Sequence, residues 1–215
     1  EAYRFLIFNY APGDEIFAFG FSRGAYTARS FVGFIRHAGI LDAVSASQIE
    51  TAIDIYHKAP AGLRGLESLE GLKFREANCT GICVSEDDRA YRIEAFASED
   101  GKGRHPAGYD PASLPILDIR YLGVWDTVRA LGIPEFIPGS AWFNRRYAFH
   151  DAVLTSKVKS ARHAVAIDEP RVTFRPTLLG QGKVAELNGA VQEQRGQARK
   201  LPLEDWELPY QERWF

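Results

Sequence analysis

The sequence predicts an α/β fold built around a mostly parallel β-sheet, and three observations support this prediction. The first is a short apolar run, Ile16 to Phe19, that leads directly into a G-x-S-x-G turn at residues 20–24. The second is a segment able to form a helix, Ala25 to Ala38, which follows the turn at once. The third is a second strand-like run, which ends in the carboxylate of Asp126. Strands that alternate with helices in this way are typical of parallel α/β sheets.

Composition and charge narrow the class of protein. The chain has 215 residues, of which 46% are hydrophobic and 25% are charged, as in an ordinary globular protein. We expect one domain over residues 1–215. The formal net charge of -2 gives no reason to expect a nucleic acid partner, because such surfaces normally carry a basic excess. No apolar run is long enough to span a membrane and no signal peptide is recognisable, so a cytoplasmic location is the default, with export without a signal peptide as the alternative.

The first forty residues predict a helix, a strand and a second helix. Apolar residues from Glu1 to Tyr10 have helical spacing, and the turn at residues 11–14 ends that helix. The strand from Ile16 is almost uninterruptedly apolar, so we expect it to be buried and covered on both faces of the sheet. The helix after residue 24 is expected to end at Gly39, which has no Cβ to hinder a left-handed conformation.

Residues 42–118 are the least regular part of the sequence. Residues 47–58 predict one amphipathic helix, whereas residues 86–110 are charged and rich in glycine. Long insertions between sheet elements are usually functional or disordered. We interpret 42–118 as a cap or lid insertion over the serine of the turn, and a solvated surface loop is the alternative. Within it, Cys79 and Cys83 match neither a C-x-x-C motif nor a zinc pattern.

The second half of the chain predicts strands at both ends and a long helix between them. Residues 118–125 predict a strand, and Tyr147 to Ile167 predicts one long amphipathic helix that carries His150 and His163. Three further segments follow: a short edge strand at Phe174–Leu178, a polar and mobile stretch at 180–200, and a strand that starts at Tyr210.

The G-x-S-x-G turn has the features of a nucleophile elbow. In such an elbow, a serine sits in a strained turn between strand and helix, and both flanking glycines avoid steric clashes. Ser22 would be the nucleophile, and the backbone N–H of Arg23 at the start of the helix would bind an oxyanion. Alternatively, the serine only caps the helix. A phosphate-binding loop fits less well, because no Gly-Lys-Ser/Thr follows.

The carboxylate at the end of the second strand suits the acid of a catalytic triad. In the chain order serine, aspartate, histidine, the acid holds the histidine in the correct tautomer and stabilises its charged form. Asp126 is the candidate, and an aspartate that only caps a turn is the alternative. His150 and His163 are both candidates for the base, although a histidine within a long amphipathic helix is more often structural.

Three segments in this order resemble one family. GFSRGAYTAR, YLGVWDTVRALGIP and SARHAVAIDEPRVTFRPTLL are similar to the uncharacterised bacterial and fungal α/β-hydrolase family related to type VI secretion phospholipase effectors. The resemblance runs from Phe8 to Phe215. It implies an α/β-hydrolase-like three-layer sandwich with Ser22 as nucleophile and Asp126 as triad acid. The family's first strand precedes the resemblance, and its triad histidine follows a Trp-Phe pair such as Trp214-Phe215. We therefore expect a fold that is incomplete at both ends.

Together these features predict a serine esterase or lipase. The substrate implied by the resemblance is an acyl ester such as a phospholipid, with peripheral membrane contact as a possible consequence. The chemistry requires no metal or other cofactor. Two alternatives remain: a non-catalytic interaction module that docks through residues 42–118, and a thioesterase or peptidase on the same fold. The sequence does not specify an oligomeric state.

Overall fold

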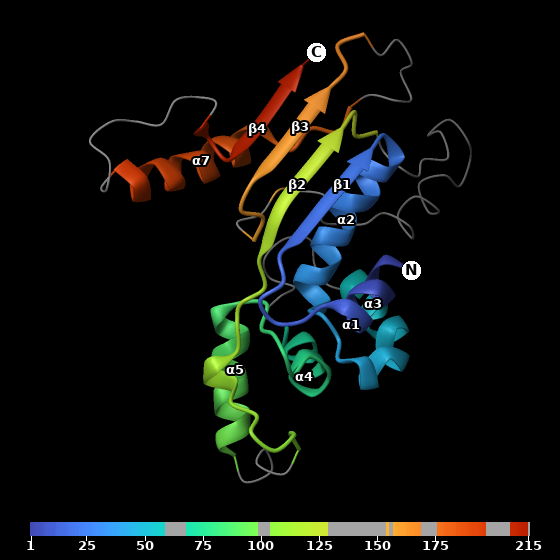
Figure 1. Ribbon diagram of the computed structural model, residues 1–215, viewed down its shortest axis with the longest axis vertical. Helices are drawn as coiled ribbons and strands as arrows, with labels where there is room; N and C mark the ends of the chain where they lie inside the picture. The colour runs from blue at the N-terminus through green and yellow to red at the C-terminus, as the bar shows by residue number, and fades with distance from the viewer. Residues whose placement is uncertain are drawn as a thin grey trace. The chain divides into compact units, whose positions relative to one another are not determined.

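The computed structural model of the protein contains twelve helices and strands in the part of the chain that it describes. Figure 1 shows these elements. The described residues are 1–58, 68–98, 104–128, 154, 157–168, 176–196 and 207–214. The elements are α1 (Ala2–Asn9), β1 (Ile16–Phe21), α2 (Arg23–Ala38), η1 (Ala43–Gln48), α3 (Ile49–Lys58), α4 (Leu69–Asn78), α5 (Glu86–Ala97), η3 (Pro111–Ser113), β2 (Ile119–Trp125), β3 (Ala161–Val165), α7 (Gln181–Gly196) and β4 (Tyr210–Trp214). The chain divides into two compact units: unit 1 is Glu1–Glu15 with Gly33–Leu117, and unit 2 is Ile16–Val32 with Asp118–Phe215.

Unit 2 contains one parallel sheet. Its four described strands lie in the order β1-β2-β3-β4, and every neighbouring pair is parallel. The predicted α/β class with a parallel sheet is therefore confirmed. The predicted strands near residues 16–19, 118–125 and 210–215 correspond to β1, β2 and β4. Parallel strands that follow one another across a sheet place their right-handed connections on one face.

Helix α2 packs on the face of the sheet that carries the even-numbered residues of β1. A Cβ built on Gly20 of β1 would lie 2.6 Å from the Cα of Ala25 in α2, which shows how close helix and strand are. Ala25 is fully buried, and so is Val124 on the neighbouring strand β2. Gly39 has φ +74° directly after the last residue of α2, so the predicted helix end is confirmed.

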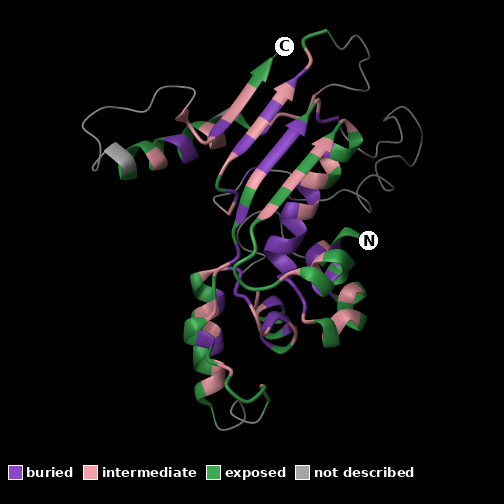
Figure 2. Ribbon diagram, viewed as in Figure 1, coloured by how far each residue is buried: buried purple, intermediate pink, exposed green. Residues whose placement is uncertain are grey.

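The prediction that the first strand is buried on both faces is wrong. Phe17, Phe19 and Phe21 alternate along β1 and are 52%, 60% and 69% exposed. Figure 2 shows this alternation of exposed and partly buried residues along β1. The rings of Phe19 and Trp125 stack with centroids 6.4 Å apart on this face. The apolar run therefore did not indicate burial on both faces of the sheet. Helix α2 covers only the face that carries the even-numbered residues of β1.

Two segments of unit 2 differ from the predicted secondary structure. Residues 161–165 form strand β3 and not part of a helix, because they pair on both sides, with β2 and with β4. Residues 147–153, 155 and 156 of that predicted helix lie outside the described residues, and His150 is among them. The stretch expected to be mobile at 180–200 contains the 16-residue helix α7. Asn188 of α7 is tied to β4, because its side chain bonds both the N–H and the carbonyl of Tyr210.

Unit 1 is helical and has an aromatic centre. Tyr3 of α1 meets Phe34 edge-on with ring centroids 4.7 Å apart, and Phe34 meets Tyr56 of α3 in the same way at 5.6 Å. The helix predicted at residues 1–10 is confirmed as α1, and the one at 47–58 is confirmed as α3, with the 3-10 turn η1 before it. Among the described residues, no helix combines the length and apolar character that a membrane crossing needs.

The alternative of a solvated surface loop does not describe the first half of residues 86–110, which is helix α5. Ser85 caps this helix by accepting a hydrogen bond from the N–H of Asp88 at 3.1 Å. Asp88 also forms ion pairs with Arg92, one turn further on, and with Arg75 of α4. These three charged side chains are buried, so the charged sequence of α5 is partly an internal network and not a solvated surface. The role of 42–118 as a lid stays a prediction.

Candidate active site

Ser22 occupies a strained turn between β1 and α2. Its φ is +55°, in the left-handed region that few residues other than glycine adopt. Its N–H donates to the carbonyl of Trp125 on β2 at 2.8 Å, and its own carbonyl accepts from the N–H of Ala25 at 3.1 Å. The residue is partly buried and lies at the carboxyl end of the sheet. The turn therefore holds Ser22 at a sheet edge next to a helix N-terminus, where a hydroxyl can meet a substrate.

Only one of the two glycines that flank Ser22 is needed to avoid a clash. A Cβ on Gly20 would overlap the backbone of Gly24 and Ala25, whereas a Cβ on Gly24 would meet nothing within 4 Å. The expectation that both glycines serve the same steric purpose is therefore wrong for Gly24. Gly20 allows the close approach of α2 to β1, because there is no side chain between them.

Matched alanine substitutions should separate the two glycines. We expect Gly20→Ala to destabilise the protein by about 1–3 kcal/mol or more, because backbone atoms and not a flexible side chain would have to move. Gly24→Ala lies within α2, so we expect it to be neutral or to stabilise the protein by up to about 1 kcal/mol through helix propensity. Thermal unfolding of both variants measures the difference. Equal destabilisation would contradict the steric assignment.

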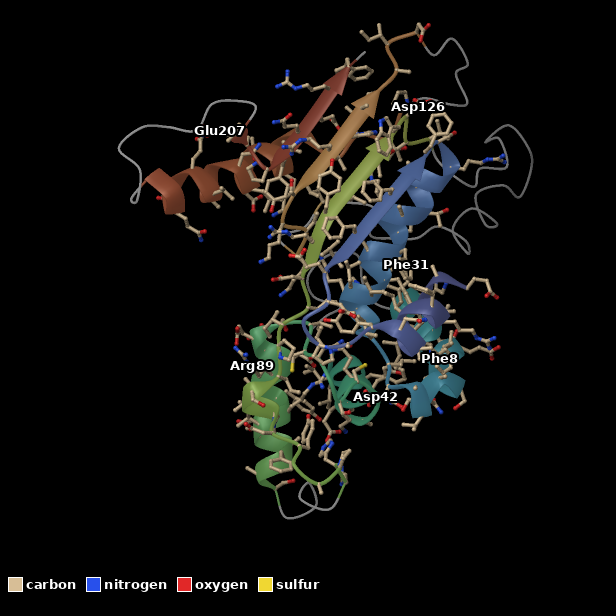
Figure 3. The ribbon with its side chains drawn as sticks, in the orientation of Figure 1. Phe8, Phe31, Asp42, Arg89, Asp126 and Glu207 are labelled. Carbon is tan, nitrogen blue, oxygen red and sulfur yellow. The ribbon has the colours of Figure 1, made fainter. Side chains whose placement is uncertain are left out.

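Asp126 follows β2 directly and has the same unusual backbone conformation as Ser22. Its φ is +44°, and its N–H donates to the carbonyl of Ala164 on β3 at 2.7 Å. Its side-chain atom Oδ1 is buried and has no hydrogen-bond partner among the residues that the structure describes. Figure 3 shows Asp126 at the carboxyl end of β2. A buried carboxylate oxygen without a partner is costly, so it indicates that a donor belongs there.

The register of the sheet brings Ser22 and Asp126 together. Phe21 and Trp125 are paired as the last residues of β1 and β2, and the serine and the aspartate are the next residue of each strand. Neighbouring strands lie about 4.8 Å apart. The two residues predicted from sequence therefore lie side by side at one edge of the sheet. Arg23, the candidate oxyanion donor, is the first residue of α2.

His163 is placed on β3, with both ring nitrogens engaged. Its Nδ1 lies 2.9 Å from Oε2 of Glu212 on β4, and its Nε2 accepts a long hydrogen bond of 3.4 Å from the N–H of Thr127. The histidine is only 2% exposed. To act as a base for Ser22, it would have to give up one of these contacts.

A carboxylate and a guanidinium group, both with buried side chains, accompany this histidine. Burial on its own would raise the pKa of Glu212, but hydrogen bonds from His163 and from the N–H of Leu179, together with the charge of Arg29, bring the pKa below its usual value. Burial lowers the pKa of Arg29 to about 10, although the charge of Glu212 opposes this shift. Glu212 is therefore ionised at neutral pH and compensates the charge of Arg29.

Sequence reasoning missed Arg29 and Glu212. Arg29 is buried on α2 between Ala25 and Val32, at the helical spacing of a core position. A charged residue at such a position is a usable sequence signal, because it is rarely buried unless it is paired. Glu212 lies on the same face of β4 as the buried Tyr210, two residues earlier, and there the sequence gives a weaker signal.

Comparisons with known proteins agree with the resemblance. Residues 1–215 match the family described as T6SS, Phospholipase effector Tle1-like, catalytic domain. The chain is also similar to the uncharacterized protein YEL023C of Saccharomyces cerevisiae (strain ATCC 204508 / S288c), with 44% identity over 175 residues, which is 81% of this chain and 20% of the yeast protein. The chain thus spans about a fifth of the length of this curated relative. No solved structure matches it.

Proposed function

Because the chain belongs to the family of Tle1-like catalytic domains of type VI secretion phospholipase effectors, we propose that it is a serine hydrolase that cleaves phospholipid acyl esters. The single observation that carries the mechanism is the pairing at the end of β1 and β2. There, Ser22 and Asp126 are neighbours in register, both on left-handed turns, and Oδ1 of Asp126 lacks a partner among the described residues.

Each group has one role in the proposed reaction. Oγ of Ser22, on a nucleophile elbow, bonds to the ester carbonyl carbon while its proton passes to a histidine, and the N–H of Arg23 stabilises the resulting oxyanion. The alcohol then leaves with that proton. Water, deprotonated by the same histidine, attacks the acyl-serine, and the fatty acid and the free serine are released. Asp126 orients the imidazole through Oδ1.

The histidine of this triad is proposed to come from the polypeptide next to Phe215. His163 is the one histidine in the described part of unit 2, and hydrogen bonds already engage both of its nitrogens. The family resemblance, in which the triad histidine follows a Trp-Phe pair, supports a histidine after Trp214-Phe215. An imidazole N–H at that place would supply the donor that Asp126 lacks.

A fluorophosphonate probe tests the proposal, because it modifies only a serine that a base activates. In the full-length protein we expect phosphonylation of Ser22, complete loss in Ser22→Ala and strong reduction in Asp126→Asn. Peptide mapping of the labelled residue gives the readout. An unlabelled Ser22 in folded wild-type protein would refute the hydrolase and favour a non-catalytic interaction module.

Substrate comparison tests the lipid assignment separately. We expect kcat/KM for phospholipid in vesicles to exceed that for a short acyl-thioester and for a peptide, because the family acts on phospholipids. Faster turnover of the thioester or the peptide would replace the lipase by a thioesterase or a peptidase on the same fold. Co-sedimentation with the vesicles would show whether the protein contacts the membrane surface.

A further inference from the structure

A buried polar network surrounds the residue that follows Asp126. Thr127 is fully buried, and both of its backbone polar groups are engaged. Its N–H donates to Nε2 of His163 at 3.4 Å, and its carbonyl accepts from the N–H of Thr177 at 2.6 Å. With the bond from the N–H of Asp126 to the carbonyl of Ala164, three hydrogen bonds made by the backbone of residues 126 and 127 fix this turn, and one of them ends on the side chain of His163.

The first of these bonds depends on the tautomer of His163. An imidazole that accepts at Nε2 must carry its proton on Nδ1, and Nδ1 faces the carboxylate of Glu212 at 2.9 Å. Oε2 of Glu212 also accepts from the N–H of Leu179 at 2.6 Å, which holds the carboxylate in place. Glu212 therefore selects the tautomer that can bind the N–H of Thr127.

The same network reaches the helix that follows Ser22. Arg29 of α2 is 3% exposed, and its guanidinium donates to the carbonyls of Thr177 and Leu178, the latter at 2.8 Å. The N–H of Thr177 in turn bonds the carbonyl of Thr127. The helix after the serine and the turn after the carboxylate are thus joined through one short segment, residues 177–179, and through Glu212.

A network of this kind is an expensive way to fill a protein interior. Buried charges lose their hydration, and apolar residues of similar volume often stabilise a protein as well or better. The left-handed conformations of Ser22 and Asp126 are strained, and such strain persists only where the surroundings hold it. The network bonds the backbone directly after Asp126 and reaches the helix that follows Ser22 through the side chain of Arg29, which gives it a geometric purpose.

We propose that His163, Glu212 and Arg29 are positioning residues that hold the Asp126 turn in register with the Ser22 turn. This inference rests on the proposed function, and it assigns His163 to orientation of the acid and not to proton transfer. A displacement of reacting groups by 1 Å can cost about 100-fold in rate, so loss of the network should act on kcat more than on KM.

The central test compares His163→Leu with His163→Gln in the full-length protein. Leucine removes both hydrogen bonds, so we expect kcat on a soluble aryl ester and the phosphonylation rate of Ser22 to fall about 100-fold, with KM changed by less than about threefold. Glutamine can accept from Thr127 through its oxygen and donate to Glu212 through its nitrogen. We therefore expect it to recover most of the rate, to within about tenfold of wild type.

A second histidine, whose side chain is buried against a carboxylate, provides the matched control. His105 of unit 1 lies 2.7 Å from Glu76, and the two side chains are 4% and 9% exposed, close to the 0% and 6% of His163 and Glu212. His105→Leu removes a comparable histidine–carboxylate hydrogen bond, so we expect a similar loss of thermal stability with kcat within about twofold of wild type. Equal losses of kcat in the two leucine variants would reduce the network to a general structural role and overturn the proposal.

Two further measurements keep the test decisive. If His163→Leu does not fold, Arg29→Lys replaces it, because lysine keeps the charge but lacks the planar fork that bonds two carbonyls, and we expect a rate loss of about tenfold. Wild-type rates in that variant would overturn the proposal.

If wild-type Ser22 is not labelled at all, the proposed function fails. Hydrogen exchange of the Thr127 amide then tests the network independently of the enzyme activity. Exchange at least about tenfold faster in His163→Leu or, where that variant does not fold, in Arg29→Lys supports the network, and unchanged exchange overturns it.

Discussion

Asp126→Asn should lower kcat for ester hydrolysis by about four orders of magnitude, because the amide stabilises the wrong tautomer of the triad histidine. The fold should survive the change, since asparagine tolerates the left-handed conformation that Asp126 adopts at φ +44° better than most residues. Steady-state kinetics of the full-length protein on a phospholipid or an aryl ester gives the rate, and thermal unfolding checks the fold.

Asp118→Asn is the matched control for this experiment. Asp118 directly precedes β2, at the opposite end of the strand from Asp126. It pairs with Lys159 at 3.0 Å, and its side chain is 49% exposed. An exposed ion pair contributes about 0–1 kcal/mol, so we expect neither stability nor kcat to change appreciably. If Asp126→Asn lost less than about tenfold in kcat, Asp126 would have no place in the triad.

Asp88→Ala should destabilise the protein by about 3–5 kcal/mol, the largest stability effect that we expect from one substitution. Oδ1 of Asp88 lies 3.1 Å from Nε of Arg75, and Oδ2 lies 2.9 Å from Nη2 of Arg92 and accepts from the N–H of Val84 at 3.0 Å. All three charged side chains are at most 1% exposed. Alanine would leave two buried guanidinium groups without their carboxylate.

The pKa of Arg92 reflects the strength of this pair. Burial on its own lowers that pKa, but the charge of Asp88 and its hydrogen bond, together with Cys83 and Cys79, raise the pKa above the ordinary value for arginine. We expect Asp88→Asn to be intermediate, because it keeps one acceptor oxygen but turns an NH2 group toward a guanidinium. Both variants are measured by chemical denaturation.

Glu86→Ala gives the baseline for the same helix. Glu86 pairs with Arg89, but its side chain is 71% exposed, so we expect a change of less than about 1 kcal/mol. Similar effects of Glu86→Ala and Asp88→Ala would show that the buried carboxylate is not needed to compensate the arginines.

The sequence was most informative where an apolar run meets a glycine-containing turn. The order of β1, turn and α2 followed from Ile16 to Arg29, and Asp126 at the end of β2 followed from the same reasoning. These features are local, because a run of apolar residues and a glycine limit the backbone wherever the segment lies. The family followed from three short motifs, and the match over residues 1–215 confirms it.

The errors occurred where strand pairing and burial depend on distant residues. Residues 161–165 have a composition that suits a helix, yet they form β3 between β2 and β4. The charged sequence of α5 did not indicate a buried helix, because the partner of Asp88, Arg75, belongs to a different helix, α4. Period and composition do not report such partners, and tertiary contacts override weak local preferences.

By itself, the sequence determined that this chain is an α/β protein of the phospholipase effector family, with a serine turn and a carboxylate turn after successive strands. Only the tertiary structure decided that these turns are neighbours in register, that Phe17 and Phe19 face outward, and that His163 bonds the turn beside Asp126. The physical reason is that turns and apolar runs are encoded within a few residues, whereas register, burial and hydrogen-bond partners are settled only when distant segments pack together.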